Sequence, residues 1–230
     1  IAAVDQATDT PTNNFATLNP LAIPTTNKPT FQEGNCKMTG AADGNKCVPA
    51  TLGVNKGKWY FEAKATDVTT NGTRFGVMSS NCVAANSVGD GTGGVNDNLG
   101  AGTQYRGAGY AQNGKGYPGN GGGTISSYGD TFTDGDIIGV LINLDDEELT
   151  FEKNDADQGV MINDLAPGDE FWFPAAQIYD TAAIVECNFG GCSAFTVSSG
   201  NADANGYGNF EYAVPSGYYA LCTKNIAEYG

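Results

Sequence analysis

Apolar and polar residues alternate one by one along the stretch that begins at Lys58. Successive side chains of a β-strand point to opposite faces, so this alternation predicts a strand with one apolar face. That face collects Trp59, Phe61, Ala63 and Ala65. No part of the chain has the spacing of about 3.6 residues that marks an amphipathic helix. We therefore expect an all-β protein built from antiparallel strands.

Other segments have the apolar content and the turn boundaries of strands. They lie at 74–79, 136–145, 148–153, 171–178, 183–189 and 217–223. A short acidic turn separates 136–145 from 148–153, so these two segments are expected to pair as a hairpin. Short strands linked by turns are typical of β-sandwiches.

Glycine dominates residues 88–124. Such a segment buries little side-chain surface and loses much backbone entropy on folding. We expect loops whose bases are held by Tyr105, Tyr110 and Tyr117, with two poorly patterned strands as the alternative. A loop longer than about 12–15 residues in a compact domain is often functional.

The charge balance excludes several classes of function. The chain has 26 acidic residues, 11 basic residues and no histidine. Nucleic-acid surfaces need clustered Lys and Arg, so no nucleic-acid partner is expected. Without histidine, chemistry would depend on carboxylates, Tyr, Lys or Cys, and we expect neither catalysis nor a cofactor. No apolar run approaches the roughly 18–20 residues that span a bilayer, so no membrane insertion is expected.

The first 48 residues differ in composition from the rest. They are rich in Thr and Asn and carry prolines at 11, 20, 24 and 29. Proline removes a hydrogen-bond donor and disfavours helix at the residue before it, so residues 1–48 are expected to form an extended arm or linker. Ile1 is not an initiator methionine and no signal-peptide pattern follows it. We expect a processed product or a segment of a longer polypeptide.

The number of cysteines is even, which is compatible with disulfides in an oxidising compartment. The expected pairs are Cys36 with Cys47, Cys187 with Cys192 and, by elimination, Cys82 with Cys222. The alternative is a set of buried thiols that act as small hydrophobic side chains. No Cys-x-x-Cys spacing occurs, so a zinc site is not expected.

Five segments carry more distinctive motifs. They are GKWYFEAKA (57–65), RFGVMS (74–79), GYAQNGKGY (109–117), SYGDTFTDGDIIGVLINLDDEELTFEKN (127–154) and FPAAQIYDTAAIVECNFG (173–190). In this order they resemble the SPRY domain, a concanavalin-like jelly roll. The resemblance implies an antiparallel β-sandwich that is not an enzyme and that holds its partners with loops at one edge. The acidic tip at 145–147 departs from the glycine-containing turn that is more common in the family.

The flanking segments resemble a narrower group. DTPTNNFATLNPL (9–21), FQEGN (31–35) and VPSGYYALCTKN (214–225) are similar to segments that bracket SPRY-like domains in structural proteins of tailed phages. This resemblance implies a virion structural or surface-display module, such as a fibre, tail or capsid-decorating element, located on the virion surface or extracellularly. It implies as partners other virion subunits, neighbouring domains, or a host glycan or protein, in a homo-oligomeric assembly.

We therefore expect three parts: the arm at 1–48, a SPRY-like sandwich at 49–200 and a C-terminal extension at 201–230 that packs on the sandwich. The expected binding surface is the loop region around 98–118. Its candidate residues are Tyr105, Arg106, Tyr110, Tyr117 and Trp172. Aromatic rings give a large contact area at low entropic cost. The alternatives are that the tyrosines anchor their own loops, and that the chain is a secreted carbohydrate-binding module of a bacterial surface protein.

Three acidic clusters have residue types that can form sites. Asp90 with Asp97, and Asp155 with Asp157, have the oxygen-rich spacing of cation loops, but the same residues are common in turns, so no metal is expected. The third cluster, 145–148, would suit a glycoside hydrolase only if two carboxyls converged at about 5–5.5 Å. The glucanase pattern Glu-x-Asp-x-x-Glu is absent. A solvated turn is the simpler interpretation.

Overall fold

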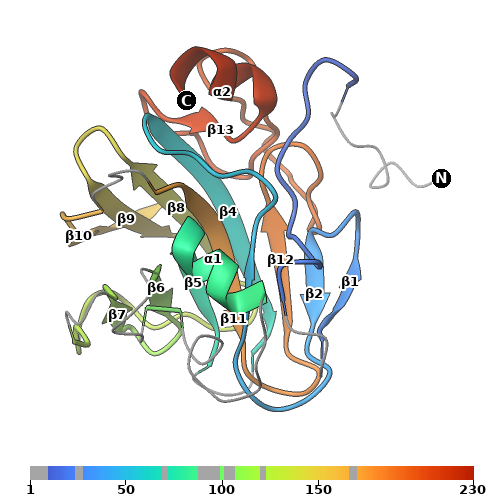
Figure 1. The fold of residues 1–230 in the computed structure, drawn as a ribbon, viewed down its shortest axis with the longest axis vertical. Coiled ribbons are helices and arrows are strands. Elements are labelled where there is room, and N and C mark those ends of the chain that lie inside the picture. Colours follow the sequence, from blue (N-terminus) through green and yellow to red (C-terminus); the bar gives the residue numbers. More distant parts are fainter. Residues whose placement is uncertain are drawn as a thin grey trace.

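A computed structural model describes residues 10–23, 28–68, 72–87, 99–100, 107–119, 123–165 and 170–230. Two sheets face each other (Figure 1). In the larger sheet the strands are β1 (Thr30–Gln32), β2 (Lys37–Thr39), β12 (Ile184–Asn188), β4 (Lys58–Asp67), β8 (Ile137–Asn143), β9 (Glu148–Lys153) and β10 (Ala156–Ile162), in that spatial order, with β13 (Tyr219–Ala220) beside β4. The smaller sheet runs β3 (Lys46–Pro49), β11 (Trp172–Ile178), β5 (Arg74–Ser79), β6 (Gly107–Ala111) and β7 (Gly116–Tyr117).

The main core lies between the two sheets. The large sheet contributes Phe61 and Val140, and the small sheet contributes Val77 and Trp172. Neighbouring strands within the two sheets pair antiparallel, apart from the short parallel pairing of β13 with β4. The predicted antiparallel β-sandwich is thus confirmed.

Strand β4 is buried on both of its faces. Trp59 and Phe61 lie in the main core, as the alternation predicts. Tyr60 lies on the opposite face, yet it is also fully buried and contacts Phe210 with an edge-to-face ring geometry at 5.1 Å. The alternation predicts that only the apolar face of this strand is buried. That expectation is wrong for β4, because a second apolar cluster covers its outer face.

That second cluster comes from the C-terminal part of the chain. Phe210 and Ala220 pack on Tyr60 and Leu141 over the outer face of the large sheet. Strand β12 pairs with β4 as far as Glu62. Beyond that point β13 pairs with the same strand, at Trp59 and Tyr60. Figure 1 shows this C-terminal part gathered around one end of β4.

Part of the segment predicted as an arm forms strands. β1 and β2 extend the large sheet, and β3 pairs with β11 in the small one. Upstream of them, Phe15 bridges to Cys222 and Leu18 bridges to Ala50. Strands of three or four residues are too short to produce a recognisable alternation, which is why the sequence pattern did not indicate them.

Two short helices lie at the periphery: α1 (Ser80–Ser87) and α2 (Thr223–Tyr229). Each spans about two turns, so neither can show an amphipathic repeat in the sequence. Among the described residues, no helix has the length and apolar character needed to cross a membrane.

The glycine-rich stretch contributes strands β6 and β7 as well as loops. A Cβ atom added at Gly76 of β5 would lie 1.9 Å from the carbonyl oxygen of Ala108 in β6. Glycine therefore allows these two strands to approach more closely than any other residue would. This matches the alternative in which poorly patterned strands occupy the stretch.

Candidate functional site

The outer face of the large sheet carries a fully buried carboxylate, that of Glu62 in β4. Its Oε1 accepts hydrogen bonds from the hydroxyl of Tyr60 (3.2 Å) and the backbone N–H of Tyr212 (2.8 Å). Its Oε2 accepts the side-chain amide of Asn188 (3.1 Å) and the backbone N–H of Glu211 (3.0 Å). Four donors thus converge on one carboxylate, which fixes the chain at 211–212 against the sheet.

Strand register places further polar residues in a row with Glu62. Glu62 lies opposite Gly139 of β8, Gly139 lies opposite Glu152 of β9, and Glu152 lies opposite Asp157 of β10. Directly opposed residues share a face of the sheet. A Cβ atom at Gly139 would lie 3.0 Å from Glu152 Oε2 and 3.1 Å from the Tyr60 hydroxyl. The glycine therefore leaves the space in which these side chains approach each other.

Burial changes the acidity of this group. Desolvation raises the pKa of Glu62, although its hydrogen bonds act in the opposite direction. Desolvation, followed by the charges of Asp155, Asp157 and Glu62, raises the pKa of Glu152 to about 7. Glu152 Oε2 is buried and has no hydrogen-bond partner in the described part of the chain. Glu152 is thus poised to titrate near neutral pH.

The geometry does not suit Glu62 for catalysis. Its carboxylate is inaccessible and its oxygens already accept four hydrogen bonds. A glycosidase nucleophile must instead reach a sugar from an open cleft. The alternation places Glu62 on the polar face of its strand. No local pattern could show that residues 207–220 pack on this face and bury it.

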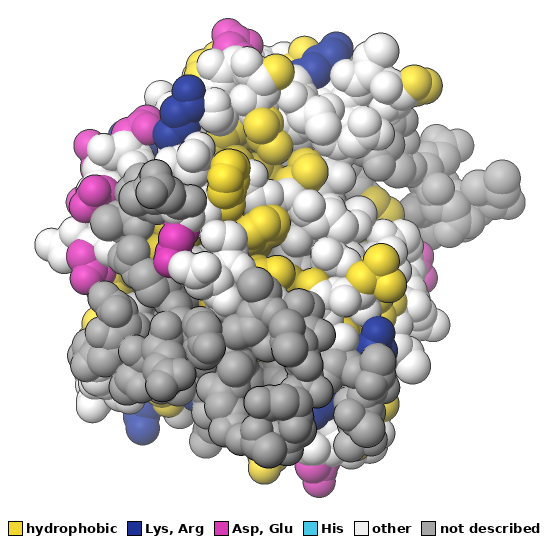
Figure 2. All heavy atoms as spheres, viewed as in Figure 1, with side chains coloured by type: hydrophobic (Ala, Val, Ile, Leu, Met, Phe, Trp, Pro, Cys, Tyr) yellow, Lys and Arg dark blue, Asp and Glu magenta, His cyan; other side chains and the backbone are white. Residues whose placement is uncertain are grey.

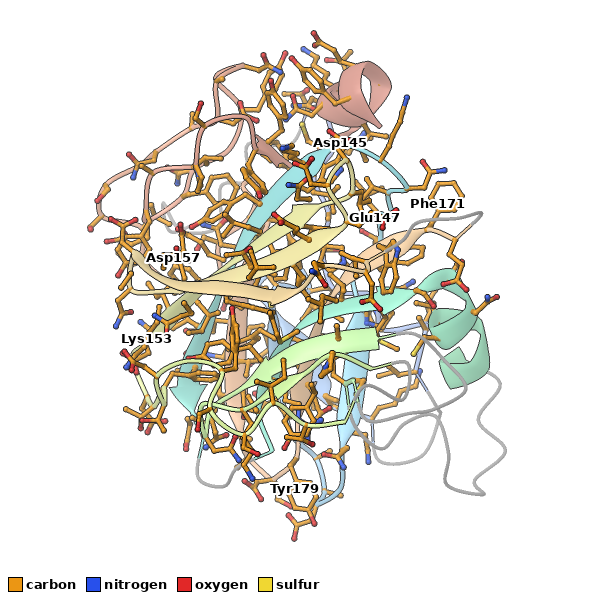
Figure 3. The ribbon with its side chains drawn as sticks, turned by 90° about the vertical axis from the view of Figure 1, so that its left-hand side faces the viewer. Asp145, Glu147, Lys153, Asp157, Phe171 and Tyr179 are labelled. Carbon is orange, nitrogen blue, oxygen red and sulfur yellow. The ribbon has the colours of Figure 1, made fainter. Side chains whose placement is uncertain are left out.

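The acidic run 145–148 is a structural turn between β8 and β9. Asp145 Oδ1 accepts the backbone N–H of Gly57 (2.9 Å). Asp146 Oδ2 accepts Lys58 Nζ (2.7 Å) and the side-chain amide of Asn143 (2.8 Å). Figure 3 shows Asp145 and Glu147 at one end of these strands and Lys153 toward the other. The simpler interpretation of these acids, as a turn, fits these contacts.

The segment of the second candidate cation loop is a hairpin. Asn154 and Asp155 both have positive φ angles, 49° and 71°, and form the two-residue turn between Lys153 and Ala156. Asp157 Oδ1 accepts the backbone N–H of Gly159 at 2.7 Å. In the described residues no three acidic or cysteine side chains are arranged to hold a metal ion. Asp90 and Asp97 lie outside the described residues.

Two of the predicted binding residues are core residues, which corrects their expected role on a loop surface. Tyr110 is fully buried among Tyr128, Phe132 and Phe151, and its hydroxyl donates to the carbonyl of Asp130. Trp172 is 2% exposed and lies in the main core. Tyr110 thus fits the alternative in which the tyrosines anchor their own loops, and Trp172 packs the core of the sandwich.

The other predicted binding residues lie at the base of the glycine-rich stretch or beyond the described part. Tyr117 stacks on the guanidinium of Arg74, which lies 3.5 Å from the ring centroid. Arg74 is 6% exposed and donates from Nη1 to the carbonyl of Leu99 (2.8 Å). Desolvation lowers the pKa of Arg74. Tyr105 and Arg106 lie outside the described residues.

The six cysteines are present as thiols, which corrects the expected disulfides. Cys36 and Cys187 are neighbours in the main core, where the backbone N–H of Cys187 donates to the carbonyl of Cys36 (2.6 Å). Cys47 lies in a different cluster, beside Cys82. A bond between Cys36 and Cys47 would therefore have to join two separate parts of the core.

In each of the two remaining expected pairs, the two cysteines also lie in different surroundings. Cys192 is half-buried and its thiol points to the carbonyl of Glu33 (3.4 Å), whereas Cys187 is enclosed in the main core. Cys222 packs in the outer cluster, away from the cluster of Cys82. Burial raises the pKa of Cys82 and of Cys187 each to about 12, which disfavours their thiolates.

A band of partly exposed apolar side chains crosses the face shown in Figure 2, over the part where Figure 1 places β13, β4 and α1. We use the name apolar band for five partly exposed apolar side chains, those of Leu52, Phe171, Phe173, Tyr219 and Tyr229. The segment before β4 lies against two of them. A Cβ atom at Gly53 would touch the ring of Phe173, and one at Gly57 would touch the carbonyl of Tyr229.

Two features of the apolar band stand out. Phe171 is 45% exposed, which is unusual for a large apolar side chain, and its carbonyl accepts the N–H of Ser80 at the start of α1. Tyr219 and Tyr229 stack at 3.9 Å. No local sequence pattern indicates this band, because its residues come from four separate segments.

The charge on the remaining surface is uneven. Residues 130–164 hold eleven acidic side chains and a single lysine, and they form β8, β9, β10 and their connections. Figure 2 shows acidic side chains along the side where β9 and β10 lie in Figure 1. The apolar band is thus flanked by a strongly acidic edge.

Comparison with known proteins gives a consistent result. The model of the SPRY domain family matches residues 58–191. Over 63 residues the chain is 36% identical to Ran-binding protein 9 of Xenopus tropicalis and of Xenopus laevis, which covers 27% of this chain and 11% of each relative. It is 38% identical over 63 residues to Ran-binding protein 10 of Danio rerio, covering 27% of this chain and 10% of the relative. The chain therefore spans about a tenth of the length of these proteins.

Among solved structures, the SPRY domain of human HERC1 superposes with a TM-score of 0.53. The alignment covers 78% of this chain and 99% of that chain, at 19% sequence identity. Similarity at this level of identity concerns the fold.

Proposed function

The chain belongs to the SPRY domain family, and on that basis we propose that it is a non-enzymatic protein-interaction module that binds a partner protein through the apolar band. The observation that carries the proposal is the band itself, in which Phe171 is 45% exposed. Exposed apolar surface flanked by polar residues is typical of protein-binding sites. Buried aromatic anchors supply most of the binding energy in such interfaces.

The use of the carboxylates supports a non-enzymatic role. Glu62 is inaccessible, and Asp146 is engaged by Lys58 and Asn143. General acid–base chemistry with carboxylates requires a pair of acids that a substrate can reach. These residues do not form such a pair.

A substitution within the band and a matched one outside it test the proposal. Phe171 and Tyr179 flank the two ends of β11 (Figure 3) and are similarly exposed, at 45% and 40%. The wild-type chain, Phe171→Glu and Tyr179→Glu are immobilised, and proteins retained from an extract of the source organism are quantified by mass spectrometry. Phe171→Glu should retain at least about tenfold less of the partner protein than the wild-type chain, since losing an anchor residue costs about 2 kcal/mol or more. Tyr179→Glu should retain the same amount as the wild-type chain.

Equal retention by both variants contradicts the proposal. Circular dichroism of each variant excludes misfolding as the cause of any loss. Both residues border the same strand, so a general effect of added negative charge would act on both.

The narrower expectations from the sequence stay predictions. The relatives reported above are frog and zebrafish proteins, and their names describe no virion component. A virion role, an extracellular location and a homo-oligomeric assembly therefore gain no support from them. The carbohydrate-binding alternative depended on Tyr105 and Tyr110, and Tyr110 is enclosed in the core.

A further inference from the structure

Several polar contacts hold the C-terminal segment on the outer face of the large sheet, and Glu62 makes two of them. Its carboxylate accepts the backbone N–H groups of Glu211 and Tyr212. Directly before them, the backbone carbonyl of Asn209 accepts the side-chain amide of Asn188, which also donates to Glu62. Between these anchored residues, Phe210 inserts its ring beside Tyr60. We call residues 209–212 the strap.

A second carboxyl group lies beside the one that holds the strap. Glu152 Oε2 and the Tyr60 hydroxyl both crowd the position above Gly139, and the same hydroxyl lies 3.2 Å from Glu62 Oε1. The two glutamates are thus separated by a glycine and a tyrosine hydroxyl, on one face of three adjacent strands.

The charged groups that act on Glu152 in the described residues are all acidic. Strand β4 contributes Glu62 and the hydroxyl of Tyr60, β10 contributes Asp157 and the hairpin turn contributes Asp155. In the strap, desolvation and then the charges of Glu211, Glu62 and Asp155 raise the pKa of the Tyr212 hydroxyl. Hydrogen bonds from Ser198, together with the charge of Lys64 in β4, lower the pKa of Glu211. Strand β8 presents Gly139 at this position and adds no charge.

We propose that Glu152 and Glu62 form a proton-sensitive latch, in which the strap is held firmly while Glu152 is protonated and is loosened when both carboxyls are ionised. Like charges at short range in a poorly solvated site repel each other strongly. In the described part of the chain, the charges that act on Glu152 are those of Asp155, Asp157 and Glu62, and no lysine or arginine is among them. Lifting the strap lets water reach both carboxylates.

Release of the strap has a structural consequence. Phe210 covers Tyr60 and Leu141, which are otherwise part of the outer face of the sheet. A rise in pH through neutrality would therefore expose an apolar area on the side of the sheet that faces away from the main core. This device is independent of the apolar band and of any partner that binds there.

Hydrogen exchange followed by NMR tests the latch. Protection factors, which remove the intrinsic pH dependence of exchange, are measured for the backbone N–H groups of Glu211 and Tyr212 at pH 5.5 and pH 8. At pH 8 the protection factors of these two amides in the wild-type chain should be about tenfold lower than at pH 5.5. A tenfold change corresponds to a shift of about one unit in the pKa of Glu152 between the closed and open strap. The amide of Val140, inside β8, serves as an internal reference.

Two variants make the result decisive. Glu152→Gln keeps the shape of the side chain and cannot ionise, so the two amides should keep the same protection at both pH values. Glu148→Gln, on the same strand but outside the row, should behave like the wild-type chain. Protection at Glu211 and Tyr212 that does not change with pH in the wild-type chain, or that changes equally in Glu152→Gln, overturns the proposal.

Discussion

The carboxylate of Glu62 accepts the backbone N–H of Tyr212 at 2.8 Å, across 150 residues of sequence. This bond joins the central strand of the large sheet to the C-terminal segment that covers it. Because Glu62 is fully buried, the bond forms away from water, where an unmet acceptor or donor is costly. The domain is therefore closed on the outer face by a segment from the far end of the chain.

Removing the charge of Glu62 should destabilise the fold. Glu62→Gln keeps the size of the side chain but replaces one acceptor oxygen with an NH2 group, so one of the two backbone N–H groups of the strap loses its acceptor. Since hydrogen bonds to a charged group contribute about 1.5–3 kcal/mol each, we expect a loss of about 3 kcal/mol in the free energy of unfolding in urea. Glu148→Gln should stay within about 0.5 kcal/mol of the wild-type chain.

Stability should fall as the pH rises toward neutrality. The pKa of Glu152 is raised to about 7 in the folded chain, against an ordinary value of 4.5. A group that binds its proton more tightly when folded stabilises the protein below its unfolded pKa and loses this effect as pH passes the folded pKa. The contribution of Glu152 should thus decline between about pH 4.5 and pH 7. Urea unfolding of Glu152→Gln should lack that decline, and identical pH profiles would contradict the assignment.

Close packing between β5 and β6 should make Gly76 intolerant of any side chain. A Cβ at this position would lie 1.9 Å from the carbonyl oxygen of Ala108, whereas one at Gly107 would lie 3.3 Å from its nearest neighbour. Gly76→Ala should lower the thermal unfolding midpoint sharply and cost about 3 kcal/mol or more, because the strands must separate. Gly107→Ala, in the paired strand, should cost about 1 kcal/mol. Equal effects would show that the strands do not approach as described.

Thiol titration checks the state of the cysteines. Ellman's reagent should detect six thiols in the denatured chain without reductant. In the native chain Cys192 should react first, since the other five are buried. A count of four or fewer in denaturant would mean that a disulfide forms. Rapid modification of Cys187 in the native chain would contradict its burial in the core.

Much of the sandwich could be predicted because its central strands have strong local patterns. The predicted strand at 74–79 has the same bounds as β5, and 148–153 has those of β9. Strand β10 was missed, because its exposed first half reads as an acidic turn and its register is interrupted by bulges. Strand β6 was expected only as the alternative to a loop, because its glycines allow a close approach of the backbones and leave no alternating pattern.

The candidate sites depended on tertiary contacts that no local pattern contains. Glu62 alternates with Phe61 and Ala63, which predicts a polar, solvated face, yet residues more than a hundred positions away bury it. Tyr110 shows the opposite error. Its glycine-rich surroundings predict an exposed loop, whereas the pairing of β5 with β6 draws its ring into the core.

Site-specific photo-crosslinking tests the central claim, that the apolar band binds a partner protein, most directly. A photoreactive phenylalanine analogue replaces Phe171 in one chain and Tyr179 in another, and both are irradiated in an extract of the source organism. We predict a discrete crosslinked protein from position 171, absent from position 179 and competed by the unlabelled wild-type chain. Crosslinks that are absent at position 171, or that are the same at both positions, would contradict the account.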